Sequence, residues 1–485
     1  MALAIRHQSI PKGIAPMKSQ KKIQTGSAAR VAVLAATGAK VGINYLKHYG
    51  KRAVTGNADR QSLDRNNAKD IYKTFSELKG GPLKVAQMLS IDQNMLPEAY
   101  SREFSKAQYS APPLSYPLVE RTFRKEFGKG PLEIFDTFSH EAVSGASIGQ
   151  VHRATIGSRQ FAVKVQYPGV ATSLKSDLAV VKPLALAMLG LKEEDVSGYF
   201  QEIETRLLEE TNYELELEHS MELSAKSAGL EQVIFPRYYP EYSTRRILTM
   251  DWIEGVPLDK FADGSADQVT RNRIGQALWD FYDDQVHHLR VFHADPHPGN
   301  FLVVGDKLCV LDFGCTKRLT NDFYRKHFAF LNPRLLDDPA LLRRAMENMN
   351  ILLPTDSPAE RRRLMQICER SIRMLARPFH EGEFDFGNPE YLREIYQMAE
   401  ENEKNGMGMR SVRGNRGSPH SLYVNRTYFG LYSLLARLKA RVVTVSVNAG
   451  FHPDSMAAGE RARPRVRPRA SMPEGTYLSQ VARVK

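Results

Sequence analysis

The sequence predicts an α+β fold of two lobes, in which a small β-rich lobe is followed by a larger helical lobe. Apolar and polar side chains alternate over residues 143–167, as in half-buried strands, whereas most of the chain after residue 320 has helical spacing. The length of 485 residues also exceeds what one hydrophobic core usually holds. We expect five regions: a basic arm and helix (1–50), a helical extension (51–130), the small lobe (131–256), the helical lobe (257–450) and a basic disordered tail (451–485).

The basic composition narrows the class of partner. The net charge of +12 favours polyanionic partners, namely nucleotides, nucleic acid or anionic lipid, and does not choose among them. The arginines of the tail lack interleaved aromatic side chains, so we expect no specific nucleic acid partner. The three cysteines have no paired spacing, which favours a reducing, cytoplasmic compartment. No apolar stretch is long enough to cross a bilayer, and any contact with the inner face of a membrane is expected to be peripheral.

Helices are expected at the start of the chain. Residues 27–49 are rich in small side chains and predict either an ordinary soluble helix or a helix that lies in a membrane interface. Residues 51–67 are polar and predict a linker. Residues 68–78 predict a second helix, which ends before Gly80, and Pro82 begins a third.

Two strands joined by a short turn are predicted at residues 143–157 and 159–167. The sequence further predicts helices at 174–191, 197–226 and 277–291, a strand that runs into a loop at 245–255, and helices from 320 to about 447 apart from a Gly- and Arg-rich loop at 404–419.

The stretch from His293 to Gly314 places Asp295, Asn300 and Asp312 around an apolar, β-rich segment. A hairpin over 301–311 would bring Asp312 back beside Asn300. A carboxylate and an amide are hard oxygen ligands of the kind that Mg²⁺ prefers, and Mg²⁺ often takes only one or two ligands from the protein. Asp295 is placed where a base or an orienting carboxylate would act in phosphoryl transfer.

A lysine for the phosphates is expected in FAVK, where Lys164 ends an otherwise apolar strand segment. A buried lysine needs a carboxylate partner, and the predicted helix 197–226 offers several glutamates. The turn before the strand should cover the phosphates, although it has no GxGxxG pattern. His293 and His297 are expected to satisfy backbone groups of their loop.

In this order, the motifs resemble those of the UbiB or aarF-domain-containing (ADCK) atypical kinase family, over roughly residues 60 to 445. The resemblance implies a protein-kinase-like bilobal fold with a helical N-terminal extension particular to the family. ASIGQVHRA resembles the family's Ala-rich loop, and HADPHPGNF and LDFG resemble its metal and catalytic loops. By resemblance, the ATP-binding residues are Ala146, Ser147, Lys164, Met250, Asp251, Asn300 and Asp312, the metal ligands are Asn300 and Asp312, and the catalytic residues are Asp295, Lys164 and Glu216.

Two further motifs are particular to this family. KVAQ is similar to its KxGQ signature, with Lys84 and Gln87 at the defining positions, and the resemblance implies a helix that covers the active site. EETNY is placed where the family's ExD motif falls, with Glu210 as its glutamate and Asn212 in place of its aspartate. Ala86 likewise replaces the glycine of KxGQ, and Ser144-Gly145-Ala146 stands where the family often has three alanines.

The resemblance implies ATP and Mg²⁺ as cofactors and a role in isoprenoid quinone synthesis, such as that of ubiquinone, or in prenyl-lipid homeostasis. We expect an ATPase or a kinase of a small lipid-like acceptor, with a lipid or quinone precursor as ligand. A catalytically weak scaffold switched by ATP is the alternative, and a phosphotransferase of the aminoglycoside or choline kinase type is a third reading. The sequence leaves homodimerisation open.

Overall fold

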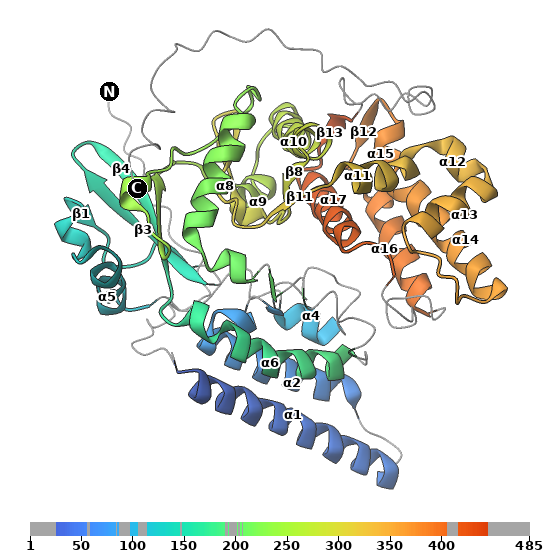
Figure 1. Cartoon of the computed structure of the whole chain (residues 1–485), viewed down its shortest axis with the longest axis horizontal. Coiled ribbons are helices and arrows are strands. Elements are labelled where there is room, and N and C mark those ends of the chain that lie inside the picture. Colours follow the sequence, from blue (N-terminus) through green and yellow to red (C-terminus); the bar gives the residue numbers. More distant parts are fainter. Residues whose placement is uncertain are drawn as a thin grey trace.

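The computed structural model describes residues 26–55, 59–83, 85–86, 98–104, 114–145, 148–189, 193, 201, 204–205, 207–404 and 416–444. In Figure 1, a small lobe with a twisted sheet and a larger helical lobe lie side by side, and a layer of N-terminal helices runs beneath them. The α+β class with two lobes is confirmed. The predicted disordered tail, 451–485, lies outside the described residues.

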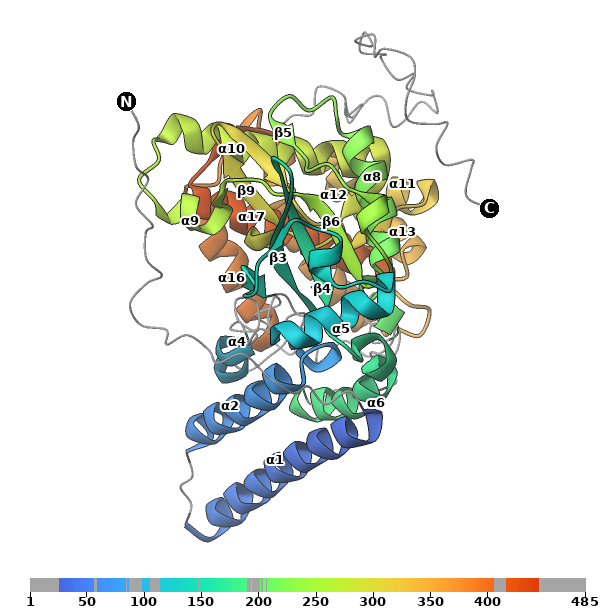
Figure 2. The ribbon, with the colours of Figure 1, turned by 90° about the vertical axis from the view of Figure 1, so that its left-hand side faces the viewer.

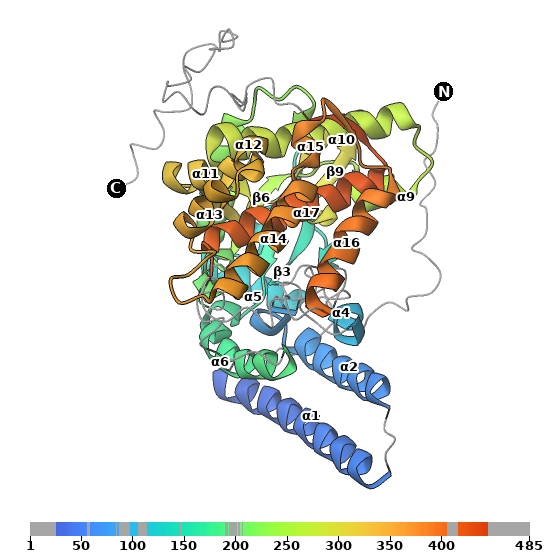
Figure 3. The same ribbon diagram turned by 90° about the vertical axis from the view of Figure 1, so that its right-hand side faces the viewer.

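The N-terminal layer consists of α1 (Ser27–Thr55), α2 (Arg60–Leu78), the short α4 (Glu98–Phe104) and α6 (Val170–Leu189). Helix α1 packs along α2 and α6, which Figures 2 and 3 show from two opposite sides. Leu34 and Val41 of α1 are buried in the shared core. The predicted helix over 27–49 is therefore confirmed and is longer than expected.

The predicted polar linker at 51–67 is wrong, because α1 continues to Thr55 and α2 begins at Arg60. The Asp59 side chain caps α2 by accepting a hydrogen bond from the Ser62 amide at 3.1 Å. Polar side chains of this stretch pair with α1: the Asn44 amide donates to the Asn67 oxygen at 2.8 Å. A polar run thus forms a helix because its partners lie in a neighbouring helix.

The small lobe is built on a sheet of order β1-β3-β4-β6, with all neighbours antiparallel and β2 paired on β3. Both predicted strands of the pair are confirmed as β3 and β4, and the predicted strand at 245–255 is confirmed as β6. In this register Lys164 lies opposite Val151 and Leu248. The elements are α5 (Tyr116–Phe127), β1 (Thr137–Phe138), β2 (Ser144–Gly145), β3 (Gly149–Ile156), β4 (Arg159–Gln166), α8 (Tyr213–Lys226) and β6 (Ile247–Asp251).

The predicted uninterrupted helix at 197–226 is wrong, because α8 begins at Tyr213. The backbone is extended at Asn212, whose side-chain oxygen accepts a hydrogen bond from the Glu214 amide at 3.2 Å and caps the helix. The Tyr213 amide instead donates to the Arg245 carbonyl beside β6. This break sets the direction in which α8 runs past the sheet, visible beside β6 in Figure 2.

The larger lobe starts with a sheet of order β5-β10-β9-β7, and its β9–β10 hairpin confirms the predicted one. The predicted helix at 277–291 ends early: a π-helical turn, Asp284–Leu289, leads into β8. The elements are β5 (Val233–Ile234), β7 (Val256–Pro257), α9 (Leu258–Asp263), α10 (Gln268–Asp283), β8 (Val291–His293), β9 (Phe301–Val304), β10 (Lys307–Val310) and β11 (Thr316–Arg318).

Helices make up most of the remaining chain, as predicted, and Figure 3 shows them covering the far side of the lobe. The sequence did not predict the small antiparallel sheet of β12 and β13, in which Phe384 faces Val442. Three residues per strand are too few for a readable alternation. The elements are α11 (Asn321–Phe328), α12 (Pro333–Asp337), α13 (Pro339–Asn348), α14 (Pro358–Leu375), α15 (Arg377–His380), β12 (Glu383–Asp385), α16 (Pro389–Lys404), α17 (Pro419–Leu438) and β13 (Arg441–Val443).

Candidate active site

Lys164 is the central cation of the candidate site. It comes from β4, and its ammonium donates to Glu216 Oε1 at 2.7 Å and to Asp312 Oδ2 at 3.1 Å. Its side chain is 11% exposed, so this ion pair lies largely out of water. The strand, α8 and the loop after β10 therefore meet at one charged group, and the two lobes are joined there.

The charges in this cluster keep Lys164 protonated, and burial raises the pKa of one of its two carboxylate partners. Burial alone would lower the pKa of Lys164, but Asp312 and Glu216 raise it well above its ordinary value. Burial raises the pKa of Glu216 to about 7, although Lys164 opposes the rise and Asp312 adds to it. Two carboxylates share one cation, so any second cation that neutralises Asp312 also makes Glu216 easier to ionise.

Asp312 is held in a fixed orientation by its own loop. The Gly314 amide donates to Asp312 Oδ1 at 2.7 Å, while Lys164 occupies Oδ2. Burial opposes ionisation, but Lys164 and this amide keep the pKa of Asp312 below its ordinary value. Phe313 between them is fully buried in the core of the larger lobe, which anchors the turn.

Asn300 lies beside the segment that leads to Asp312, because the Leu311 amide donates to the Asn300 carbonyl at 3.0 Å. The side-chain amide of Asn300 donates to the Asp295 carbonyl at 3.0 Å, which leaves the side-chain oxygen as its acceptor atom. An amide oxygen next to an ionised carboxylate fits a Mg²⁺ site. The described residues contain no group of three or more His, Cys, Asp or Glu suited to a metal, and a two-ligand Mg²⁺ site needs none.

The Asp295 carboxylate faces Arg426 of α17, whose Nη2 is 3.4 Å from Asp295 Oδ1. Both side chains are about one fifth exposed, at 20% and 21%. Sequence reasoning missed Arg426, because nothing in the local pattern links it to a loop 131 residues earlier. The contact can orient Asp295.

Replacing Arg426 with alanine is expected to lower ATP turnover about tenfold with little change in KM, because Asp295 loses the contact that orients it. Steady-state kinetics measure this split. Arg437→Ala is the matched control, since Arg437 lies on the same helix and pairs with Asp263 at the surface. An unchanged kcat in Arg426→Ala would show that the pair does not serve the reaction.

His297 satisfies a backbone group of its loop, as expected, whereas the His293 ring contacts a side chain of α10. His293 is buried, with its Nδ1 at 3.3 Å from the Tyr282 hydroxyl. His297 Nδ1 accepts a hydrogen bond from the Gly299 amide at 3.1 Å. These contacts fix the loop that carries Asp295.

Met250 and Asp251 end β6 next to β4. Met250 is buried in a cluster that also contains Tyr167 and Tyr213. The Asp251 carboxylate accepts hydrogen bonds from the Tyr239 hydroxyl at 2.6 Å and the Arg237 amide at 3.1 Å. The loop before β6 thus engages this carboxylate, and a role for either residue in nucleotide binding stays a prediction.

The ExD-like motif lies at the start of α8. Glu210 is buried and close enough to Glu216 for its charge to raise the pKa of Glu216. Asn212 is the N-cap of the helix that carries Glu216. The substituted position therefore has a structural use that either an asparagine or an aspartate can fill. Of the other predicted residues, Ala146, Ser147, Lys84 and Gln87 lie outside the described residues.

This capping role predicts a contrast between two substitutions. Asn212→Ala is expected to lower the free energy of unfolding by about 1 kcal/mol, whereas Asn212→Asp should stay within about 0.5 kcal/mol of the parent. Urea unfolding measures both. Equal losses in the two variants would contradict the cap.

Sequence reasoning also missed Tyr213, which is fully buried with its ring 5.0 Å from the Lys164 ammonium. An aromatic face stabilises a buried cation without competing for its hydrogen bonds. The break of α8 at Asn212 is what places Tyr213 there, and an uninterrupted helix would not predict it.

A bilobal α+β fold with a strand lysine, a helix glutamate and a hairpin carrying Asn300 and Asp312 defines a kinase-like protein. The comparisons with known proteins agree: residues 106–342 match the ABC1 atypical kinase-like domain. This match, together with relatives named as COQ8 atypical kinases, confirms the resemblance to the UbiB/ADCK family that the motifs indicate.

Two relatives are similar to this chain over different shares of their own lengths. Protein ACTIVITY OF BC1 COMPLEX KINASE 8, chloroplastic, of Arabidopsis thaliana is 31% identical over 59% of this chain and 39% of its own length. Atypical kinase COQ8, mitochondrial, of Saccharomyces cerevisiae is 28% identical over 78% of this chain and 75% of its own. The chain thus spans well under two thirds of the plant relative.

A solved structure shows the same fold. Rv3197 from Mycobacterium tuberculosis, determined as a complex with erythromycin, aligns with a TM-score of 0.55 at 24% identity, covering 81% of this chain and 96% of that one. The likeness confirms the kinase-like bilobal arrangement.

Proposed function

We propose that this chain binds ATP with Mg²⁺ and transfers or hydrolyses the γ-phosphate, in support of isoprenoid quinone synthesis or prenyl-lipid homeostasis. One observation carries the proposal: the buried Lys164 and Glu216 and the partly exposed Asp312 form a single charged cluster where the two lobes meet. The kinase-like family supports nucleotide binding, and the relatives named COQ8 support the pathway.

Each residue of the site would have a separate role in binding the nucleotide or in the transfer. Asp312 and the side-chain oxygen of Asn300 would hold Mg²⁺, which neutralises phosphate charge when bound. Lys164 would exchange its contact with Asp312 for the phosphates while Glu216 keeps it in place. Asp295 would orient the attacking water or hydroxyl.

A catalytically weak scaffold switched by ATP is the second candidate. The Arg426 contact favours it, because the guanidinium occupies one oxygen of the carboxylate that would otherwise face the attacking group. Turnover, as opposed to binding alone, separates the two proposals.

Contact with an anionic membrane surface belongs to the same proposal. None of the described helices is long and apolar enough to cross a membrane. The outer face of α1 carries Ile43, Leu46 and Tyr49, which are 50%, 73% and 50% exposed, beside basic residues such as Lys47. This combination supports peripheral binding to anionic lipid from the cytoplasmic side.

The experiment compares Mg²⁺-dependent ATP hydrolysis with and without anionic vesicles, and with and without a phenolic mimic of a quinone precursor. We expect turnover that vesicles or the phenol increase. Tight nucleotide binding without turnover in any condition would reject the enzyme and leave the scaffold. Neutral vesicles are the control for the charge of the surface.

A further inference from the structure

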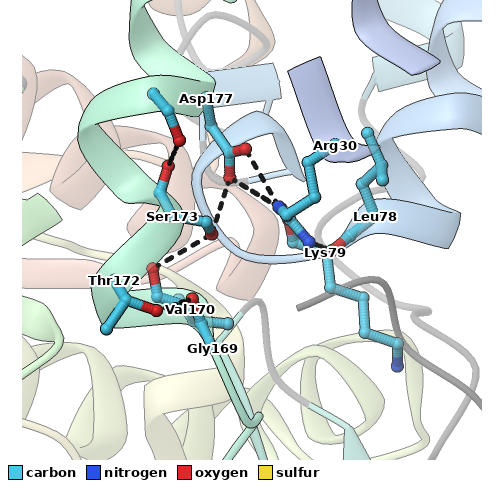
Figure 4. A network of polar contacts seen from close by, with 9 residues as sticks. Arg30, Leu78, Lys79, Gly169, Val170, Thr172, Ser173 and Asp177 are labelled. Carbon is cyan, nitrogen blue, oxygen red and sulfur yellow. Dashed lines mark hydrogen bonds and ion pairs between the residues drawn. The ribbon is translucent and has the colours of Figure 1, made fainter. Parts of the chain in front are cut away.

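A buried arginine joins three helices of the N-terminal layer. Arg30 of α1 and Asp177 of α6 are 2% and 0% exposed, and Arg30 Nη2 lies 2.6 Å from Asp177 Oδ2. The same guanidinium donates to the Leu78 carbonyl at 2.6 Å and to the Lys79 carbonyl at 3.1 Å, at the end of α2. Figure 4 shows these contacts converging, with Ser173 as a further donor to Asp177.

The segment that Arg30 holds is a tight turn before the KVAQ motif. Lys79 has a φ of 57°, which costs energy for a residue with a side chain, and Gly80 continues at 64°. A Cβ on Gly81 would lie 2.8 Å from Leu174 of α6, so the turn is seated directly on that helix. Arg30 therefore ties this strained turn to α6 through Asp177.

The turn is in contact with the strand of the candidate site. The Lys79 ammonium lies 4.1 Å from the centre of the Tyr167 ring, and Tyr167 follows Lys164 by three residues. Tyr167 and Tyr213 belong to one buried cluster, and the Tyr213 ring faces Lys164. Arg30 is thus connected, through Lys79 and the cluster that holds Tyr167 and Tyr213, to the surroundings of Lys164.

The other side of the turn leads into KVAQ itself. Leu83, Val85 and Ala86 are fully buried in the core that α1, α2 and α6 share, together with Leu34 and Val41 of α1. Helix α1 therefore shares a core with the KVAQ segment, in addition to holding the turn before it through Arg30.

We propose that Arg30 and Asp177 are positioning residues for the nucleotide site: they fix the Lys79–Pro82 turn, and through it both the KVAQ segment and the strand that carries Lys164. This proposal rests on the proposed function, because the site that the two residues would position is the ATP site. Burying an ion pair rarely adds net stability over apolar residues of similar size. Hydrogen bonds from one guanidinium to the Asp177 carboxylate and to the Leu78 and Lys79 carbonyls do specify one arrangement of α1, α6 and the end of α2.

The test is Arg30→Met with Asp177→Leu, which keeps the buried volume and removes every polar contact of the pair. We expect the fold to persist, amide exchange of residues 78–86 to rise about tenfold or more, and exchange at Gln166 and Tyr167 to rise with it. We expect the Kd for Mg²⁺-ATP to weaken about threefold or more, because the site is less preorganised. Arg30→Lys should shift all three quantities in the same direction by less.

Lys40→Ala is the matched control, because Lys40 also joins α1 to α2, through a solvent-exposed pair with Asp70. Faster exchange confined to 78–86, with Gln166, Tyr167 and the Kd unchanged, would overturn the positioning role. If the parent binds no nucleotide, the proposed function fails separately, and exchange at Gln166 and Tyr167 still decides the proposal. Should the double variant unfold, Arg30→Lys gives the same readouts.

Discussion

Asp312→Asn is expected to lower Mg²⁺-dependent ATP turnover by about 10³-fold or more, because it removes the only full negative charge offered to the metal in the predicted ligand pair. The asparagine oxygen can still accept the Gly314 amide, so the loop keeps its shape. Since Asp312 is one of the groups that raise the pKa of Glu216, its loss strengthens the Lys164–Glu216 pair, and the fold should be retained. Steady-state hydrolysis and thermal unfolding measure the two effects.

Asp306→Asn provides the control for Asp312→Asn, because Asp306 lies at the tip of the same hairpin and pairs with Arg273 at the surface. Its turnover should match the parent. Turnover in Asp312→Asn within tenfold of the parent would remove Asp312 from the reaction.

Lys164→Met is expected to lower the free energy of unfolding by about 3–5 kcal/mol at pH 8, because it leaves the buried Glu216 and the partly exposed Asp312 without their cation. The loss should be smaller at pH 6 by about 1–2 kcal/mol. Urea unfolding at the two pH values measures the difference.

The sign of this pH dependence follows from Glu216. The pKa of Glu216 is raised to about 7 in the folded protein, so the folded state holds this proton more tightly than the unfolded state. The resulting contribution to the free energy of unfolding is present at low pH and is lost as the pH rises toward 7. Lys164 lowers this pKa, and without Lys164 the pKa rises further. The variant therefore binds more protons than the parent between pH 6 and 8 and loses stability faster across that range.

Lys226→Met is the control for charge removal, because Lys226 pairs with Glu222 on the exposed face of the same helix. We expect it to change stability by less than about 1 kcal/mol at either pH. A larger loss at pH 6 than at pH 8 in Lys164→Met would contradict the assigned role of Glu216.

The sequence was most informative where chemistry is local. The β9–β10 hairpin between Asn300 and Asp312 follows from a short apolar run, and the strand of Lys164 follows from its alternation. The need for a carboxylate partner then points to the glutamates of the predicted helix at 197–226. The partner Glu216 was named by resemblance, and the geometry brings it to Lys164 at 2.7 Å.

The start of α8 and the long-range contacts were beyond local reasoning. Thr211 and Asn212 are not strong helix breakers by type, and the Tyr213 amide bonds to the Arg245 carbonyl, which lies far away in the sequence. Arg30 and Asp177 are 147 residues apart, and neither carries a motif. Such pairs depend on how distant helices pack against one another, and this packing cannot be predicted from a short segment of the sequence.

Calorimetric titration of the full chain with a nonhydrolysable ATP analogue tests whether Asn300 and Asp312 form a Mg²⁺-nucleotide site. Binding is measured in Mg²⁺ and in EDTA, for the parent and for the double variant Asn300→Ala with Asp312→Asn. We predict saturable binding that needs Mg²⁺ and weakens at least about tenfold in the double variant. Binding that is the same in EDTA, or unchanged in the double variant, would contradict a Mg²⁺-nucleotide site at Asn300 and Asp312.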